Sequence, residues 1–154
     1  MNQLFYENTA DEDYATFFVA EYDDTTRRLR YANCGHLSAL LLRHDNTLER
    51  LDSTSTVLGL FEEWDCALKE RQLFAGDTLM LYTDGITESV NAAWEEFREQ
   101  RLIEALRRDR GLSSQALIQS LVDEVRQFNP REQQDDITLI VAKCREGLVG
   151  SPRK

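Results

Sequence analysis

The feature that most constrains the fold is a change in hydrophobic periodicity just past the middle of the chain. Up to residue 83, apolar residues recur in short extended segments separated by polar turns, a pattern typical of strands. After that point, apolar residues at helical spacing predict helices over 97–108 and 113–128, and 137–143 predicts a closing strand. A run of strands, a helix pair and a last strand predict an α+β fold with mainly antiparallel sheets.

The individual elements follow from the same patterns. Strands are predicted over 15–23, 27–33, 37–43, 47–51, 66–73 and 78–83, and residues 1–8 indicate the tail of a helix. In the helix over 113–128, the apolar stripe consists of Leu117, Leu121, Val125 and Phe128, and Ser113 or Ser114 is expected to cap the first turn. No repeat or linker interrupts the chain, so we expect one domain over 1–145 and a tail over 146–154.

Composition excludes several classes of protein. The chain is 42% hydrophobic and 30% charged, as in a soluble globular domain. A net charge of −10 argues against a nucleic-acid partner, because phosphate binding needs a basic surface. The longest apolar runs are far too short to cross a membrane, and the start lacks the features of a signal peptide. A cytoplasmic protein without a membrane partner is therefore expected.

The cysteines predict neither a disulfide framework nor a zinc site. Cys34, Cys66 and Cys144 are odd in number, widely separated and free of any C-x-x-C pairing. We interpret them as buried or incidental thiols.

Carboxylates stand at the ends of two predicted strands. Asp84 follows an apolar strand directly, and Gly85 beside it lets the backbone turn. Asp135 and Asp136 precede the last strand. Mg²⁺ and Mn²⁺ prefer oxygen ligands, so these acids suit a metal site if the two strands lie side by side. An Asp-Gly turn and a solvated acidic loop are the alternative, purely structural interpretation.

Five short motifs, taken in order, resemble the metal-dependent protein phosphatase (PPM) family. They resemble in particular its SpoIIE/RsbU branch of bacterial stress and sporulation regulators, and the likeness runs from about residue 16 to 144. The motifs are Asn33-Cys34-Gly35-His36, Val57-Leu58-Gly59, Gly76-Asp77, Tyr82-Thr83-Asp84-Gly85-Ile86-Thr87-Glu88 and Asp135-Asp136-Ile137-Thr138.

The resemblance implies a sandwich of two antiparallel sheets with outer helices and a centre for two Mn²⁺ or Mg²⁺ ions. Asp84 and Asp135 would bind metal, with Asp136 a further candidate ligand. Gly85 would keep the turn open, and Glu88 would contact the metal ligands without binding the metal itself. Such a centre activates water for in-line attack on phosphorus, so no nucleophilic Cys or Ser-His pair is needed. The segment around Asn33 is expected to be structural.

One family feature is missing from the sequence. Complete members begin with a Gly-Asp-x-x-Gly-His-Gly segment whose Asp bridges the two metals, and no such segment occurs here. Asp11 and Asp13 lack the glycine pattern and are not expected to replace it. Either the chain is the C-terminal two-thirds of a longer phosphatase domain, or it is a degenerate domain that binds partners without catalysis.

Three functions follow from these alternatives. The first is a metal-dependent phosphoserine or phosphothreonine phosphatase, acting on a bacterial regulatory protein such as an anti-sigma-factor antagonist, with a sensor or receiver domain possible upstream. The second is a non-catalytic interaction module with the same fold. The third is an unrelated α+β ligand-binding domain. Missing strands would also expose sheet edges, so self-association of this chain is expected.

Overall fold

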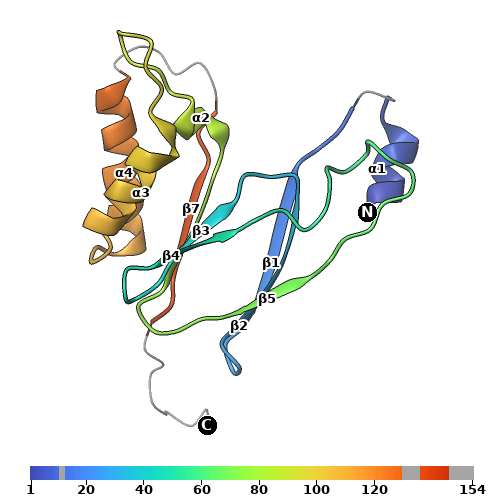
Figure 1. Cartoon of the computed structure of the whole chain (residues 1–154), viewed down its shortest axis with the longest axis horizontal. Helices are drawn as coiled ribbons and strands as arrows, with labels where there is room; N and C mark the ends of the chain where they lie inside the picture. The colour runs from blue at the N-terminus through green and yellow to red at the C-terminus, as the bar shows by residue number, and fades with distance from the viewer. Residues whose placement is uncertain (11–12, 130–135, 146–154) are drawn as a thin grey trace. The chain divides into compact units, whose positions relative to one another are not determined.

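The computed structural model describes residues 1–10, 13–129 and 136–145 (Figure 1). The chain forms two compact units. The first unit comprises residues 1–38 and 50–73, and the second comprises 39–49 and the chain from 74 onward. Each unit is described by itself below. Among the described residues, no helix combines the length and the apolar character needed to cross a membrane.

The first unit is built on a three-stranded antiparallel sheet in the order β1-β2-β5. Its elements are α1 (Asn2–Asn8), β1 (Phe17–Asp23), β2 (Arg28–Cys34) and β5 (Lys69–Gln72). The central strand, β2, is the buried one: Leu29 and Tyr31 lie on one face, and Tyr31 stacks on Phe18 of β1 at a ring distance of 5.8 Å. Strand β1 is largely exposed, because its outer edge has no partner strand among the described residues.

The second unit contains a four-stranded sheet in the order β4-β3-β6-β7 (Figure 1). Its strands are β3 (Ala39–Leu42), β4 (Leu48–Leu51), which begins in this unit, β6 (Thr78–Tyr82) and β7 (Leu139–Lys143). Its helices are α2 (Asp84–Thr87), α3 (Arg98–Arg108) and α4 (Ser114–Phe128). The apolar stripes of α3 and α4 share one buried cluster with β3 and β6, so the sheet and the two long helices enclose a single core.

Most sequence-predicted elements are confirmed, and the α+β class with antiparallel sheets is correct. Ser113 caps α4, since its hydroxyl accepts a hydrogen bond from the Ala116 amide. Leu117, Leu121 and Val125 are buried as expected, and Phe128 is half-buried. Two details were wrong. The strand predicted over 66–73 covers Lys69–Gln72, and the short helix α2 was not predicted.

The motif around Asn33 has the structural role expected from the sequence. The Asn33 side chain is fully buried: its Nδ2 donates to the carbonyl of Leu51 (3.2 Å), and its Oδ1 accepts from the His36 amide (2.9 Å). Gly35 adopts φ +71, and a Cβ there would lie 2.5 Å from a methyl group of Val57. The motif therefore holds a tight turn after β2.

Asp77 is a buried structural acid at the start of β6. Its carboxylate is 1% exposed and accepts hydrogen bonds from Arg43 (2.7 Å) and from the backbone amides of Phe74 (2.9 Å) and His44 (3.0 Å). Burial alone would raise the pKa of Asp77, but these bonds hold the pKa below its ordinary value of 3.8. Asp77 thus ties the turn before β6 to the end of β3.

We expect Asp77→Asn to lower the free energy of unfolding at neutral pH by about 1.5–3 kcal/mol, because it removes a charged partner from buried donors. The folded pKa is lowered, so the contribution of Asp77 is present above the unfolded pKa and is lost as pH falls from about 4 downward. Denaturant unfolding at pH 7 and pH 3 measures both effects. The difference in free energy of unfolding between wild type and Asp77→Asn should be smaller at pH 3 than at pH 7. Asp24→Asn, in an exposed turn, should unfold with the same free energy as the wild type. An equal difference for Asp77→Asn at both pH values would contradict the stabilising role of the Asp77 carboxylate.

Candidate metal centre

The candidate site lies where β6 ends and β7 begins, at one end of the second sheet (Figure 1). The two strands are antiparallel, and Tyr82 is paired with Leu139. One step beyond, the Thr83 amide donates to the carbonyl of Thr138 at 3.1 Å. Asp84 follows immediately as the first residue of α2, and Asp136 lies two residues before Thr138. The structure therefore brings together the two strand ends that the sequence analysis selected.

The Thr83 hydroxyl fastens these two ends. It donates to the backbone carbonyl of Asp136 at 3.0 Å and accepts from the Thr138 amide at 2.9 Å. A hydroxyl offers one donor and two acceptor lone pairs, so both bonds form at once. Thr83 thereby sets the position of the backbone that carries Asp136 relative to the residue before Asp84. The sequence analysis did not identify this role, since it depends on a residue more than 50 positions away.

Asp84 and Asp136 are the acids that this arrangement presents to solvent. Both are exposed, and the Asp84 Oδ1 accepts from the adjacent Gly85 amide at 3.0 Å. Exposed carboxylates suit Mg²⁺ and Mn²⁺, which often bind through one or two carboxylates and retain several waters. Asp84 and Asp136 could supply such carboxylates. The described residues contain no group of three His, Cys, Asp or Glu side chains placed to hold a metal ion.

The other sequence-predicted site residues have the following places. Asp135 lies outside the described residues. Gly85 is buried in α2 and does not have a positive φ, so its backbone forms a helical turn rather than the sharp turn expected. Glu88 is exposed at the end of α2, and its amide donates to the Asp84 carbonyl at 2.8 Å. Asp13 belongs to the first unit, where its carboxylate accepts from the Ala10 amide.

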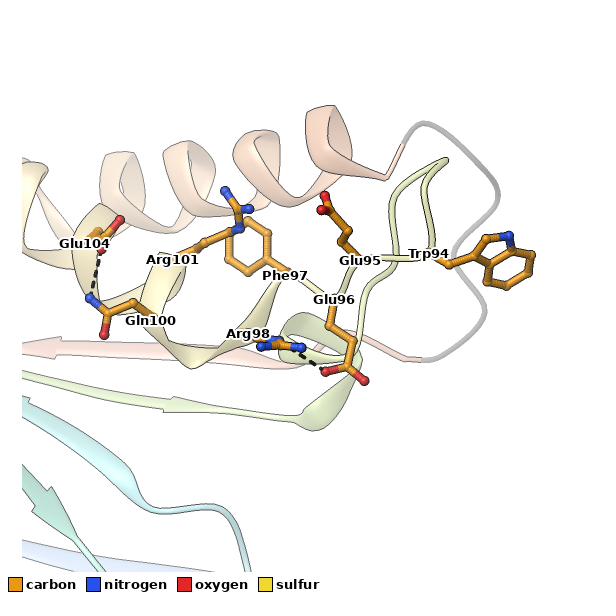
Figure 2. Close-up of a pocket in the computed structure, with 8 residues that line it drawn as sticks. All are labelled: Trp94, Glu95, Glu96, Phe97, Arg98, Gln100, Arg101 and Glu104. Carbon is orange, nitrogen blue, oxygen red and sulfur yellow. Dashed lines mark hydrogen bonds and ion pairs between the residues drawn. The ribbon is translucent and has the colours of Figure 1, made fainter.

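A pocket of about 520 Å³ lies beside the start of α3 (Figure 2). It is formed by the loop after α2 and the first turns of α3, and its lining is mostly charged. Figure 2 shows Trp94 projecting from the loop, and this side chain is 70% exposed. Salt bridge Arg98–Glu96 (3.6 Å) and hydrogen bond Gln100–Glu104 (2.8 Å) occupy two sides of the pocket. The pocket lacks a convergent set of like charges for one ligand.

Arg98 begins α3 in an uncommon backbone conformation. It adopts φ +64, in the left-handed region that glycine enters without steric cost. The backbone at the edge of the pocket is therefore one that glycine would adopt more easily than arginine.

This α+β fold with antiparallel sheets matches the fold of solved PP2C-type phosphatase domains. Residues 1–145 match the family Stage II sporulation protein E (SpoIIE), and the chain belongs to that family. The family prediction from the sequence is confirmed, and the interpretation as an unrelated ligand-binding domain is wrong.

Individual relatives agree with this assignment. The chain is 28% identical to the phosphoserine phosphatase RsbU of Bacillus subtilis over 146 residues, which is 93% of this chain and 43% of RsbU. The SiaA-PP2C domain of Pseudomonas aeruginosa superposes with a TM-score of 0.80 at 19% identity, over 92% of this chain and 57% of that one. The catalytic domain of the serine/threonine phosphatase PstP was solved with two manganese ions. It superposes with a TM-score of 0.68 at 17% identity, over 94% of this chain and 67% of that one. The chain thus spans less than half of RsbU.

Replacing Thr83 by Val should loosen the junction between the strand ends. We expect a loss of about 1–2 kcal/mol in the free energy of unfolding, because two hydrogen bonds of one hydroxyl disappear. Amide hydrogen exchange at Thr138 should speed up about tenfold, since this amide loses its acceptor. Thr83→Ser keeps the hydroxyl and should preserve slow exchange. Unchanged exchange at Thr138 in the Val variant would show that the hydroxyl does not fasten the strands.

Proposed function

We propose that this chain carries part of the active centre of a Mn²⁺- or Mg²⁺-dependent phosphatase that acts on phosphoserine or phosphothreonine in a protein. The observation that supports the proposal is the junction of two strand ends through Thr83, each of which carries an exposed acid, Asp84 or Asp136. The relative RsbU is named a phosphoserine phosphatase, and the similar domain of PstP was solved with two manganese ions.

The chemistry assigned to each part is limited to what these residues can do. Divalent ions supply water activation and offset negative charge on the phosphoryl group. Asp84, Asp136 and the neighbouring Asp135 are the residues that would hold the ions. Because Asp84 and Asp136 are exposed, a phosphate group on the surface of another protein could reach them without opening the fold. The chain accordingly uses no covalent nucleophile in this proposal.

The substrate and context belong to the same proposal. We expect a phosphorylated bacterial regulatory protein, such as an anti-sigma-factor antagonist, as the substrate, and a cytoplasmic location in stress or sporulation signalling. A net charge of −10 permits a phosphoprotein substrate when bound cations lie between the two negative groups. A sensor or receiver domain in the same protein would supply the regulation.

The second candidate function is a non-catalytic interaction module with the same fold. It is favoured by one observation: the described residues lack a complete cluster of metal ligands. The sequence likewise lacks the Gly-Asp-x-x-Gly-His-Gly segment. Metal affinity separates the two functions, because an interaction module needs no metal.

The deciding experiment compares the wild-type chain with Asp84→Asn and with Asp13→Asn as a matched control. Free Mn²⁺ is measured by electron paramagnetic resonance, and phosphate release from a phosphoserine peptide is measured at increasing Mn²⁺. We expect Mn²⁺ binding that is weaker by about tenfold or more in Asp84→Asn, by analogy with the 10–100-fold losses seen around metal sites. Asp13→Asn should bind as the wild type does.

The two readouts have distinct outcomes. Turnover that requires Mn²⁺ and is lost in Asp84→Asn would support the phosphatase. Mn²⁺ binding that depends on Asp84 without turnover would favour an incomplete centre, which a longer version of the protein should complete. Equal Mn²⁺ binding in wild type and Asp84→Asn would refute the metal role of Asp84.

We also propose that the chain self-associates in isolation. Among the described residues, strand β1 is an edge strand of the first sheet, and its Val19 side chain is 46% exposed. Unprotected edges of this kind pair with other chains. Multi-angle light scattering over increasing concentration should show a rising mean mass, and Val19→Lys, on this edge strand, should reduce it. A constant monomer mass at high concentration would count against self-association.

A further inference from the structure

Two thiols in the first unit lie against each other although 32 positions separate them in the sequence. The Sγ atoms of Cys34 and Cys66 are 3.8 Å apart, and both cysteines are free. This contact was not foreseen from the cysteine spacing, which gave no sign of a pair. It is therefore a property of the fold.

The contact lies just beyond the pairing of β2 with β5. The paired residues of these antiparallel strands end at Tyr31 and Lys69, and Ser55 forms the bridge beside Cys34. Cys66 lies three residues before β5 and reaches Cys34 through its side chain. The Sγ–Sγ distance of 3.8 Å must shorten to about 2.05 Å in a disulfide. The fold therefore places the two sulfur atoms in contact without pairing their strands directly.

We propose that Cys34 and Cys66 form a reversible disulfide site that reacts with low-molecular-weight disulfides. The site is separate from the acids of the candidate metal centre and does not depend on the proposed function.

The surroundings keep the two thiols together in the reduced state. Cys34 ends β2 and is paired with Phe17 on one side, while Ser55 forms a bridge with Cys34 on the other. The Ser55 hydroxyl donates to the carbonyl of Asp65, the residue before Cys66. The segment that carries Cys66 is therefore already held beside β2. The two sulfur atoms are thus kept near each other before any bond forms.

The two thiols differ in access, which sets the order of reaction. Cys34 is 2% exposed, whereas Cys66 is half-buried and reachable from solvent. Burial, together with the hydrogen bond to Cys66, raises the pKa of Cys34 to about 11. Cys34 is therefore protonated and shielded at neutral pH. Cys66 is the thiol that meets the reagent first, and Cys34 is the resolving thiol.

The exchange balances in two steps. The Cys66 thiolate attacks one sulfur of a small disulfide RSSR, which forms a mixed disulfide and releases one RS⁻. Cys34, as its thiolate, then attacks the Sγ of Cys66, which closes the Cys34–Cys66 bond and releases the second RS⁻. The two protons lost by the protein are taken up by the two released thiolates. The protein dithiol is oxidised, and RSSR is reduced to two RSH.

The test equilibrates the native chain with mixtures of reduced and oxidised glutathione, followed by acid quenching and mass spectrometry. The disulfide is identified by the tryptic peptides 31–43 and 51–69 joined to each other, because each contains one of the two cysteines. The same titration in concentrated guanidinium chloride gives the unfolded reference. The quantity compared is the ratio [GSH]²/[GSSG] at which half of the chains carry the disulfide. Because the native fold holds the two thiols together, this ratio should be about tenfold or more higher in the native chain than in the unfolded chain.

Variants complete the test. Cys144→Ser, in the second unit, should titrate as the wild type does, whereas Cys66→Ser should form no intramolecular bond. The oxidised wild type should unfold at a higher guanidinium concentration than the reduced form, since the bond closes a long loop. A native chain that stops at a glutathione adduct on Cys66 would overturn the proposal. A glutathione ratio at half-oxidation that is no higher in the native chain than in the unfolded chain would also overturn it.

Discussion

The antiparallel pairing of β6 with β7 is the interaction on which the candidate site depends. It joins segments more than 50 residues apart, and it fixes which residues follow one another at the end of the sheet. A slip of one residue would move every side chain of a strand to the other face. The register is protected against such a slip on the core side by Met80 and Tyr82, which are buried, and at the open end by the hydroxyl of Thr83.

The same pairing explains why the acids are exposed. The apolar residues of β6 end at Tyr82, and the buried core continues with Ile86 of α2. Asp84 and Asp136 lie between these core positions and the paired strand ends, where the Thr83 hydrogen bonds hold the backbone and the two acidic side chains are exposed. Hydrogen-bonded backbone with solvated carboxylates is compatible with the metal role proposed for these acids.

The sequence was sufficient to predict elements whose signal is local. Periodicity identified the helix α4 and its cap at Ser113, and apolar runs located the strands to within a few residues. Helix α2 escaped because four residues carry no periodicity. The roles of Thr83, Asp77 and the pair Cys34–Cys66 escaped for another reason. Each depends on a partner that is distant in the sequence and is brought near by the fold, which no short motif contains.

The motifs shared with the family divide into two physical kinds. Gly35 and Gly59 adopt positive φ, and a Cβ at either would clash with Val57 or Phe5, so the backbone itself requires glycine. Asp84 is different: its side chain is exposed, and its carboxylate accepts a hydrogen bond from the neighbouring amide, so packing requires little of it. The fold therefore explains why glycine stands at positions 35 and 59 but does not explain the acid at position 84. Asp84 is thus available for the metal role proposed for it.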